Sequence, residues 1–150
     1  MADAFDPLAL DNQLCFALYA ANRAVTGRYR ALLDDLGLTY PQYLVMLVLW
    51  EAAQQAQVMT VSSLGQRLRL DSGTLTPLLK RLEGRGLVQR RRAATDERVV
   101  ELRLTAAGQA MRQQAQHVPV QLFCDSGMEL SDLVQLREQL RGLLRRLESD

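Results

Sequence analysis

Apolar residues recur at intervals of three and four in the N-terminal part of the chain, a spacing that places side chains on one face of an α-helix. The pattern predicts a long amphipathic helix that ends before Gly37, with Asp11 or Asn12 as its N-terminal cap. Its stripe consists of Leu14, Leu18, Ala21, Val25, Tyr29, Leu32 and Leu36. A second helix is expected to start at Thr39-Tyr40-Pro41, because proline is tolerated in a first turn. Residues 44–50 are apolar on nearly every face of that helix, which places it in the core.

Two shorter helices are expected next, over residues 60–69 and 72–85, with a tight turn between them. Asp71 is placed to cap the second of these helices and Gly86 to end it. The buried stripe of the second helix is expected to be Leu75, Leu78, Leu79 and Leu82. A short helix, a tight turn and a basic helix form the layout of a helix-turn-helix.

Two strands are predicted after this pair, over residues 88–92 and 98–104, joined by residues 93–97. The second strand alternates Val100, Leu102 and Leu104 inward with Glu101 and Arg103 outward. A basic hairpin directly after a recognition helix is a wing. The expected fold class is therefore mainly α with a small β-hairpin wing, a winged helix-turn-helix.

The C-terminal part of the chain is expected to be helical again. Thr105 caps a helix that Pro119 should kink or end near Val118, and Ser131 caps a last helix that runs to about Ser149. Leucines in this last helix are spaced three, four, three and four residues apart, the narrow seam along which helices pack on one another. They are Leu133, Leu136, Leu140, Leu143 and Leu147.

The first and last helices carry long apolar stripes, whereas the middle of the chain already has its own core. We therefore predict that the two ends form a homodimer across a two-fold axis, with intrachain packing of the same stripes as the alternative. The expected organisation is a single domain over residues 1–150. It comprises dimerisation helices at about 10–37 and 106–150 and a DNA-binding lobe at about 40–104.

Composition narrows the function classes. The chain begins without a basic-then-apolar leader, and its longest apolar stretch is far below the roughly 20 residues that span a bilayer, so we expect a cytoplasmic protein. Cys15 and Cys124 are too far apart in sequence for the paired spacing of zinc sites, and His117 is the only histidine, so no metal and no cofactor are expected. The sequence offers neither a phosphate-binding glycine loop nor a Ser/His/Asp set, which argues against an enzyme.

Charge is distributed unevenly although the chain carries a net charge of only +1. Residues 67–98 contain nine basic and four acidic side chains, a local charge of +5 that suits a polyanion such as double-stranded DNA. The outward face of the basic helix is predicted to contact DNA through Ser72, Thr74, Thr76, Pro77, Lys80 and Arg81. The wing is predicted to contribute Arg90, Arg91, Arg92 and Arg98. Asp96 is expected to orient Arg98 by a bidentate pair; the alternative is an ordinary surface ion pair.

A thiol near several phenols is the second candidate site. Cys15 lies on the first helix with Tyr19 one turn later, while Tyr29 and Tyr40 lie on either side of the junction with the second helix. Hydroxyl groups stabilise a thiolate without blocking access to it, as a peroxide-reactive cysteine requires. Taken alone, a cysteine in an apolar stripe is more often an inert core residue.

Several segments of the sequence carry a family resemblance. They run from Leu64-Gly65-Gln66-Arg67-Leu68 through Leu75 to Glu83, then Gly86-Leu87-Val88, and finally Asp96-Glu97-Arg98 and Leu104-Thr105. Together they resemble the MarR family of regulators. The similarity covers nearly the whole chain. The resemblance implies a dimeric winged helix-turn-helix with a recognition helix in the major groove and a wing arginine in the minor groove. Members of this family are usually repressors, so the resemblance also implies repression.

Residues 14–19, Tyr29 and residues 38–43 are similar to the organic hydroperoxide regulators within that family. The resemblance implies that Cys15 is the sensor for an organic hydroperoxide, with Tyr29 and Tyr40 of the partner subunit as hydrogen-bond donors and Tyr19 nearby. It leaves Cys124 as either a resolving thiol that closes an intersubunit disulfide or a spectator. Two other functions stay open: a repressor released by a small aromatic ligand, with Cys15 not the sensor, and a thiol peroxidase.

Overall fold

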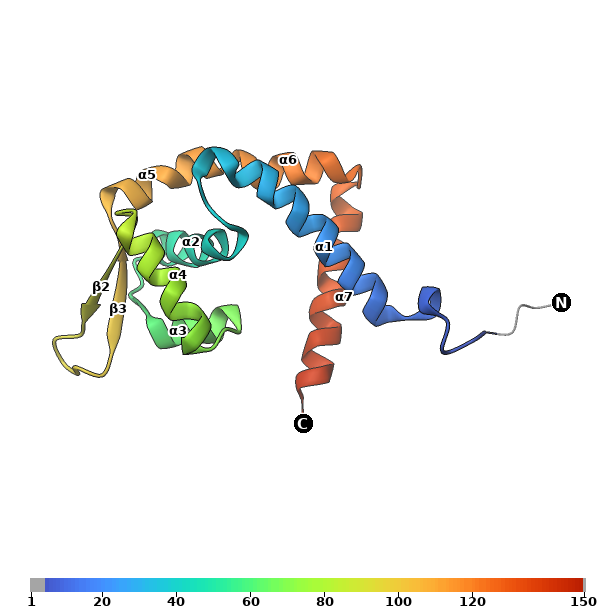
Figure 1. Cartoon of the computed structure of the whole chain (residues 1–150), viewed down its shortest axis with the longest axis horizontal. Coiled ribbons are helices and arrows are strands. Elements are labelled where there is room, and N and C mark those ends of the chain that lie inside the picture. Colours follow the sequence, from blue (N-terminus) through green and yellow to red (C-terminus); the bar gives the residue numbers. More distant parts are fainter. Residues whose placement is uncertain (1–4, 150) are drawn as a thin grey trace. The chain divides into compact units, whose positions relative to one another are not determined.

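In the computed structural model, which describes residues 5–149, the chain divides into two compact units between Gln116 and His117. The helices of the first unit are α1 (Leu14–Leu33), α2 (Tyr40–Gln54), α3 (Val61–Leu68), α4 (Ser72–Gly84) and α5 (Ala106–Ala115), with short 3-10 helices at Leu10–Asn12 and Asp34–Leu36 (Figure 1). Its strands are β1 (Met59–Thr60), β2 (Val88–Arg92) and β3 (Val100–Leu104). The second unit contains α6 (His117–Ser126) and α7 (Leu130–Glu148).

Helix α1 is the predicted amphipathic helix, but it begins differently from the expectation. The cap at Asp11 or Asn12 is wrong, because both residues lie in the 3-10 helix that precedes α1. Gln13 occupies the N-cap position instead, and its side-chain amide donates to the carbonyl of Ala9 at 3.0 Å.

The junction between α1 and α2 is closed by a glycine. The N–H groups of Gly37 and Leu38 donate to the carbonyls of Asp34 at 2.9 Å and Leu33 at 3.4 Å. Gly37 has a φ of 63°, the left-handed conformation that ends many helices and that glycine adopts without a steric penalty. The α-helix itself ends at Leu33, earlier than predicted, and the 3-10 helix Asp34–Leu36 continues the helical segment to just before Gly37.

Helix α2 forms the centre of the first unit. It starts with a capping box in which Thr39 and Gln42 each accept a hydrogen bond from the other's backbone N–H, so the predicted start is confirmed. Most of the apolar run is buried as expected; Leu44 is half-buried and Leu47 is 41% exposed. The indole of Trp50 donates to the carbonyl of Gly108 at 2.9 Å and so joins α2 to α5.

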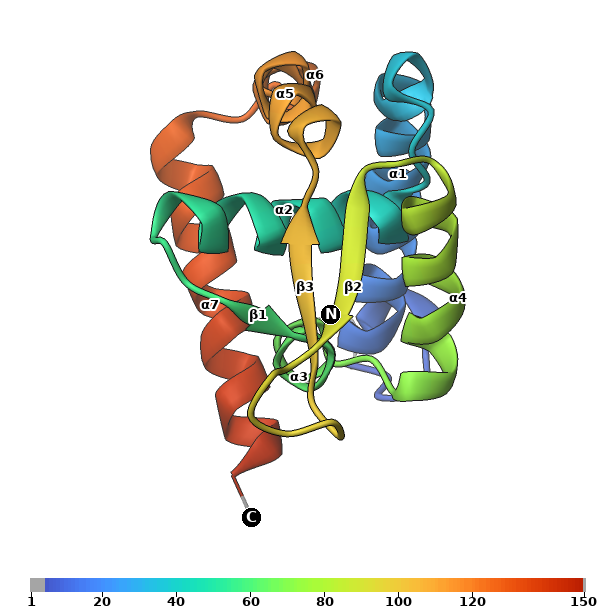
Figure 2. The same ribbon diagram turned by 90° about the vertical axis from the view of Figure 1, so that its left-hand side faces the viewer.

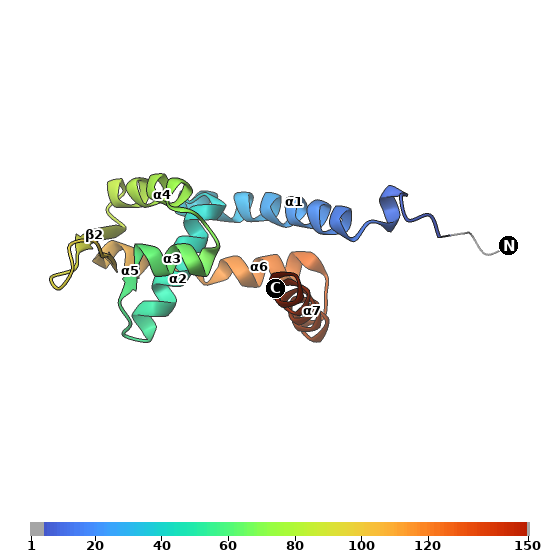
Figure 3. The same ribbon diagram turned by 90° about the horizontal axis from the view of Figure 1, so that it is seen from below.

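Helices α3 and α4 lie next to each other, and the hairpin extends beyond them (Figure 3). Thr60 caps α3 and Asp71 caps α4, the latter as predicted. The four leucines predicted to form the stripe of α4 are all buried and pack on the side where α2, α3 and β2 contact this helix. The core of the first unit is therefore built around the helix-turn-helix, which fixes the orientation of α4.

The sheet has three antiparallel strands in the order β1-β3-β2, with β3 in the centre (Figure 2). Strand β1 is an addition to the predicted hairpin; it pairs Met59 with Leu102 and Thr60 with Glu101. This pairing explains why Glu101, predicted to point outward, is half-buried. Strand β3 starts at Val100, two residues later than predicted. The winged helix-turn-helix expected from the sequence is confirmed, with a small sheet in place of a simple hairpin.

Helix α5 begins as predicted, because the Thr105 hydroxyl accepts from the N–H of Gly108 at 3.0 Å. It ends at Ala115, earlier than the break expected near Val118, and Pro119 lies in the first turn of the next helix, where proline is tolerated. The predicted cap at Ser131 is wrong: α7 begins at Leu130, with Glu129 at the N-cap position.

The leucine seam of α7 is largely accessible in the single chain. Leu136, Leu140 and Leu147 are 45%, 39% and 70% exposed, whereas Leu133 and Leu143 are half-buried.

Among residues 5–149, none of the helices combines the length and the apolar character that crossing a membrane requires.

Candidate functional site

The first candidate site is the outward side of α4, here called the recognition surface and defined by the six helix residues predicted to contact DNA. Burial of the leucine stripe leaves five of them exposed and Thr76 half-buried. At the start of the helix, the Asp71 carboxylate accepts from the N–H of Thr74 at 2.8 Å, and these backbone hydrogen bonds lower the pKa of Asp71. The cap fixes the first turn of α4, and Lys80 and Arg81 follow two turns later on the solvent side.

The wing carries the remaining predicted contacts, and Arg98 is the most accessible of those in ion pairs. Its side chain is 92% exposed, and Nε lies 3.3 Å from Oδ1 of Asp96. The same carboxylate oxygen accepts from the backbone N–H of Arg98 at 3.0 Å. The expected bidentate pair is therefore replaced by one oxygen that binds both the backbone and the side chain. Asp96 shapes the turn and leaves most of the guanidinium facing solvent.

Two other wing arginines have partners within the first unit. Arg90 Nε lies 2.8 Å from Oε2 of Glu83, so this ion pair connects β2 to α4. Arg92 donates to the carbonyl of Glu97 at 2.9 Å across the hairpin. Arg91 lies between them on β2 and is exposed. Arg91 and Arg98 of the wing therefore face solvent, whereas Arg90 and Arg92 bind other residues of the first unit and stabilise the hairpin.

The second candidate site is a cluster of three aromatic rings at the α1–α2 junction, here called the tyrosine cluster. The ring of Tyr29 lies 5.0 Å from that of Tyr40 and 5.5 Å from that of Tyr43, centroid to centroid. Burial raises the pKa of Tyr29 and of Tyr40, and it raises the pKa of Tyr43 to about 12. Phenols are protonated at neutral pH in any case, so all three can donate hydrogen bonds, and burial extends that state to higher pH.

The thiol predicted to react with peroxide lies near the other end of α1. Cys15 is exposed, and Tyr19, one turn later, is 57% exposed. The Tyr19 hydroxyl accepts from Arg23 at 3.1 Å, and the Arg23 guanidinium lies 5.6 Å from the ring centroid. Fourteen residues separate Cys15 from Tyr29, which corresponds to roughly 21 Å along a helix. The tyrosine cluster of one chain is therefore out of reach of that chain's own Cys15.

Cys124, the second thiol, lies on α6 in the second unit and is also exposed. Among the described residues, no group of three or more His, Cys, Asp and Glu side chains is arranged to hold a metal ion.

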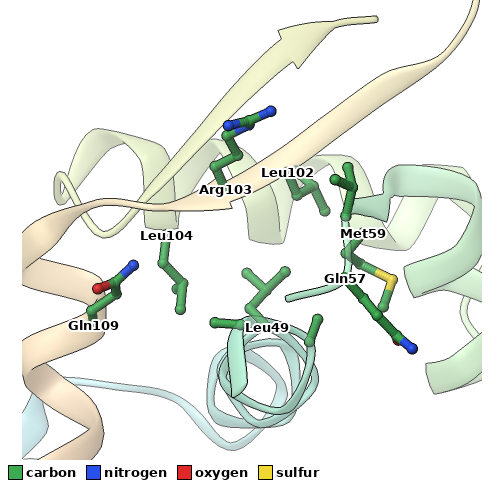
Figure 4. A pocket seen from close by; sticks show the side chains of 10 residues that line it. Leu49, Gln57, Met59, Leu102, Arg103, Leu104 and Gln109 are labelled. Carbon is green, nitrogen blue, oxygen red and sulfur yellow. The ribbon is translucent and has the colours of Figure 1, made fainter. Parts of the chain in front are cut away.

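A cleft of about 290 Å³ opens behind the sheet, between α2, β1, β3 and α5 (Figure 4). Leu49, Met59, Leu102 and Leu104 form much of its wall, together with Gln57 and Gln109. Neither cysteine nor tyrosine is among the described residues that line it, so the cleft is separate from both candidate sites.

Sequence reasoning missed two members of these sites. Tyr43 follows Tyr40 by three residues on α2, so helical spacing was the available signal that both face Tyr29. Glu83 was assigned no role, and its ion pair with Arg90 depends on how the hairpin packs, which local spacing does not contain.

Known proteins resemble this chain along nearly its whole length. A family model for the transcriptional regulators SarA/Rot matches residues 28–115. An organic hydroperoxide resistance transcriptional regulator of Bacillus subtilis (strain 168) is 46% identical over 147 residues, which are 98% of this chain and 97% of the relative. The HTH-type transcriptional regulator TtmR of Methylorubrum extorquens (strain PA1) is 47% identical over 138 residues, 92% of this chain and 69% of the relative. These relatives are transcriptional regulators and not enzymes.

Solved structures of AbfR, a protein of Staphylococcus epidermidis, have the same fold. Reduced AbfR bound to DNA is 36% identical, with a TM-score of 0.75 over 93% of this chain and 95% of that chain. Overoxidized AbfR bound to DNA is 37% identical, with a TM-score of 0.73 over 92% and 94%. The disulfide form of AbfR is 37% identical, with a TM-score of 0.64 over 90% and 92%. The chain therefore belongs to the MarR family of winged helix-turn-helix transcriptional regulators, in the group of organic hydroperoxide resistance regulators.

Proposed function

We propose that this protein is a peroxide-sensing repressor whose reduced homodimer binds operator DNA and whose Cys15, when oxidised by an organic hydroperoxide, causes release. The observation that carries the proposal is the exposed position of Cys15 on α1, roughly 21 Å along the helix from the phenols at the α1–α2 junction. The Bacillus subtilis relative is named for organic hydroperoxide resistance, and AbfR has been solved in reduced, overoxidized and disulfide forms.

A second copy of the chain would cover the apolar side chains that are exposed on α1 and α7. Leu14 and Val25 on α1 are 59% and 41% exposed, and the seam of α7 is similarly accessible. Apolar area removed from water contributes about 25 cal/mol per Å², so these stripes favour association. In a two-fold dimer with antiparallel α1 helices, Cys15 of one protomer comes to the tyrosine cluster of its partner.

The sensing step follows from thiol chemistry. The Cys15 thiolate attacks one oxygen of the hydroperoxide, the O–O bond breaks, and the second oxygen leaves as an alcohol after taking a proton. The sulfur becomes a sulfenic acid. Tyr29 and Tyr40 of the partner, which are protonated at neutral pH as phenols ordinarily are, donate to the thiolate before the reaction and lose that geometry after it.

DNA release follows from the spacing of the two recognition surfaces. A dimer of this class contacts half-sites about 34 Å apart, so a change at the dimer helices moves both α4 helices out of register with the major groove. Lys80, Arg81 and the outward wing arginines supply the charge that binds phosphates in the reduced state.

Cys124 is the candidate resolving thiol. Its thiol condenses with the Cys15 sulfenic acid to give a disulfide and water, and a small thiol then restores both cysteines. Non-reducing electrophoresis after hydroperoxide treatment distinguishes the roles, since only a resolving Cys124 gives a band of dimer size that Cys124→Ser abolishes.

Binding of the full-length protein to its own upstream DNA, followed by fluorescence anisotropy, tests the proposal. We expect cumene hydroperoxide in slight molar excess to lower the affinity at least tenfold, and dithiothreitol to restore it. Cys15→Ser should bind DNA but ignore the oxidant, and light scattering should show a dimer. A response that persists in Cys15→Ser contradicts the sensor assignment, and wild-type binding that ignores peroxide directs attention to a ligand-released repressor.

A further inference from the structure

Arg85 connects the recognition helix to the α1–α2 junction. It stands at the C-cap of α4, where its backbone N–H donates to the carbonyl of Arg81 at 3.1 Å. From there the guanidinium reaches the junction between α1 and α2. Its Nη1 donates to the carbonyl of Gly37 at 2.6 Å and its Nη2 to that of Leu36 at 3.0 Å. One side chain thus spans two elements 48 residues apart in sequence.

Both ends of this link lie in hydrogen-bonded turns. Beyond Arg85, Gly86 has a φ of 72°, and the N–H of Leu87 donates back to the carbonyl of Leu82 at 3.1 Å, which closes the end of α4. At the other end, the acceptor carbonyls belong to Leu36, the last residue of the 3-10 helix after α1, and to Gly37, whose φ is left-handed. A positive charge at the C-terminal end of a helix is also favourable for its dipole.

The turn that Arg85 holds is the one that carries the tyrosine cluster. Gly37 lies between Tyr29, near the end of α1, and Tyr40, at the start of α2, whose rings are 5.0 Å apart. Tyr43, 2% exposed, packs against Tyr29 from the next turn of α2. A change in the packing of these rings therefore acts on the same turn whose carbonyls bind Arg85.

We infer that Arg85 is a positioning residue that couples the tyrosine cluster to the recognition helix. In the reduced protein the two guanidinium hydrogen bonds hold α4 in its DNA-binding orientation relative to the junction. When the cluster rearranges, the junction carbonyls move and α4 moves with them. The inference rests on the proposed function, because it explains how oxidation at Cys15 reaches DNA.

The test measures a ratio: the affinity of the reduced full-length protein for its upstream DNA divided by that of the protein oxidised with cumene hydroperoxide. Oxidation of Cys15 is followed separately by mass spectrometry. In Arg85→Ala we expect oxidation of Cys15 as in the wild type, but a ratio at least threefold smaller. A purely structural role lowers both affinities alike and leaves the ratio unchanged.

A second variant disturbs the same contact from the opposite side. A Cβ added at Gly37 lies 3.2 Å from Nη2 of Arg85, and asparagine tolerates a positive φ better than most residues. Gly37→Asn should therefore also reduce the ratio at least threefold, and in the Arg85→Ala background it should add nothing further. Arg103→Ala is the matched control, since that arginine pairs with Glu101 on its own strand, and it should keep the wild-type ratio.

The outcomes separate the inference from the proposed function. A ratio within threefold of wild type in Arg85→Ala, or in Gly37→Asn if the first variant does not fold, overturns the coupling role. If wild-type protein with oxidised Cys15 binds DNA as tightly as the reduced protein, the proposed function fails and the inference fails with it.

Discussion

Gly108→Ala provides the sharpest test of the packing between the wing and α5. In an ordinary helix this change is favourable by about 1 kcal/mol, because alanine is the better helix former. Here an added Cβ clashes with the backbone carbonyl oxygen of Leu87 and lies 3.2 Å from Cδ2 of Leu104. The Leu87 carbonyl cannot swing away, since it already accepts from the N–H of Thr105 at 3.1 Å.

Relief must therefore come from a shift of α5, and that shift stretches the buried hydrogen bond from the Trp50 indole to the Gly108 carbonyl. Overpacking costs about 1–3 kcal/mol and a weakened buried hydrogen bond about 1–3 kcal/mol. After the gain in helix propensity, we expect a net loss of about 1–5 kcal/mol, or a midpoint lower by about 2–4 °C for each kcal/mol lost.

Thermal unfolding by circular dichroism, at one fixed protein concentration, measures this effect. Gly84→Ala is the matched control because a Cβ there meets open space among the described residues, and it should leave the midpoint unchanged or raise it slightly. A Gly108→Ala protein as stable as the wild type would refute the assigned contact between α5 and the base of β2.

Three further predictions concern the two candidate sites. Arg98→Ala should weaken operator binding about 5- to 100-fold at fixed salt, whereas a mere surface ion pair with Asp96 predicts a change within about twofold. Lys80→Ala should flatten the log–log salt dependence of operator binding by about 2 for the dimer, a slope that titrations at several salt concentrations measure directly. The pKa of Tyr43 is raised to about 12, so the free energy of unfolding should hold below pH 10 and fall by roughly 2 kcal/mol as the pH rises to 12. Tyr43→Phe should lose that part of the decline in urea titrations; an identical profile contradicts the buried phenol.

Local sequence patterns predicted the helices and the recognition surface well, because both depend on interactions within a few residues. The leucine stripe of α4, its cap at Asp71 and the start of α2 follow from periodicity and capping chemistry. The caps at Asp11 or Asn12 and at Ser131 were wrong, since several polar residues compete near a helix start and only the backbone conformation selects one.

Features that depend on distant contacts were out of reach of these patterns. Strand β1 has two residues, too short for an alternating pattern, and forms because β3 provides a partner. The bonds of Arg85 join positions that no local spacing relates. The tyrosine cluster is intermediate: Tyr29 and Tyr40 were predicted near the junction, whereas Tyr43 was missed although helical spacing places it on the same face of α2 as Tyr40.

The length of α1 has a genetic consequence under the proposed mechanism. Because Cys15 and the tyrosine cluster lie at opposite ends of one helix, each sensing site takes its sulfur from one subunit and its phenols from the other. A subunit with Cys15→Ser and a subunit with both Tyr29→Phe and Tyr40→Phe are each defective alone. Co-expressed, they assemble mixed dimers in which one site is intact and the other has lost both parts. Purified mixed dimers should then release DNA when peroxide is added, whereas homodimers of either variant stay bound, so each allele would be dominant over the wild type in a cell exposed to peroxide.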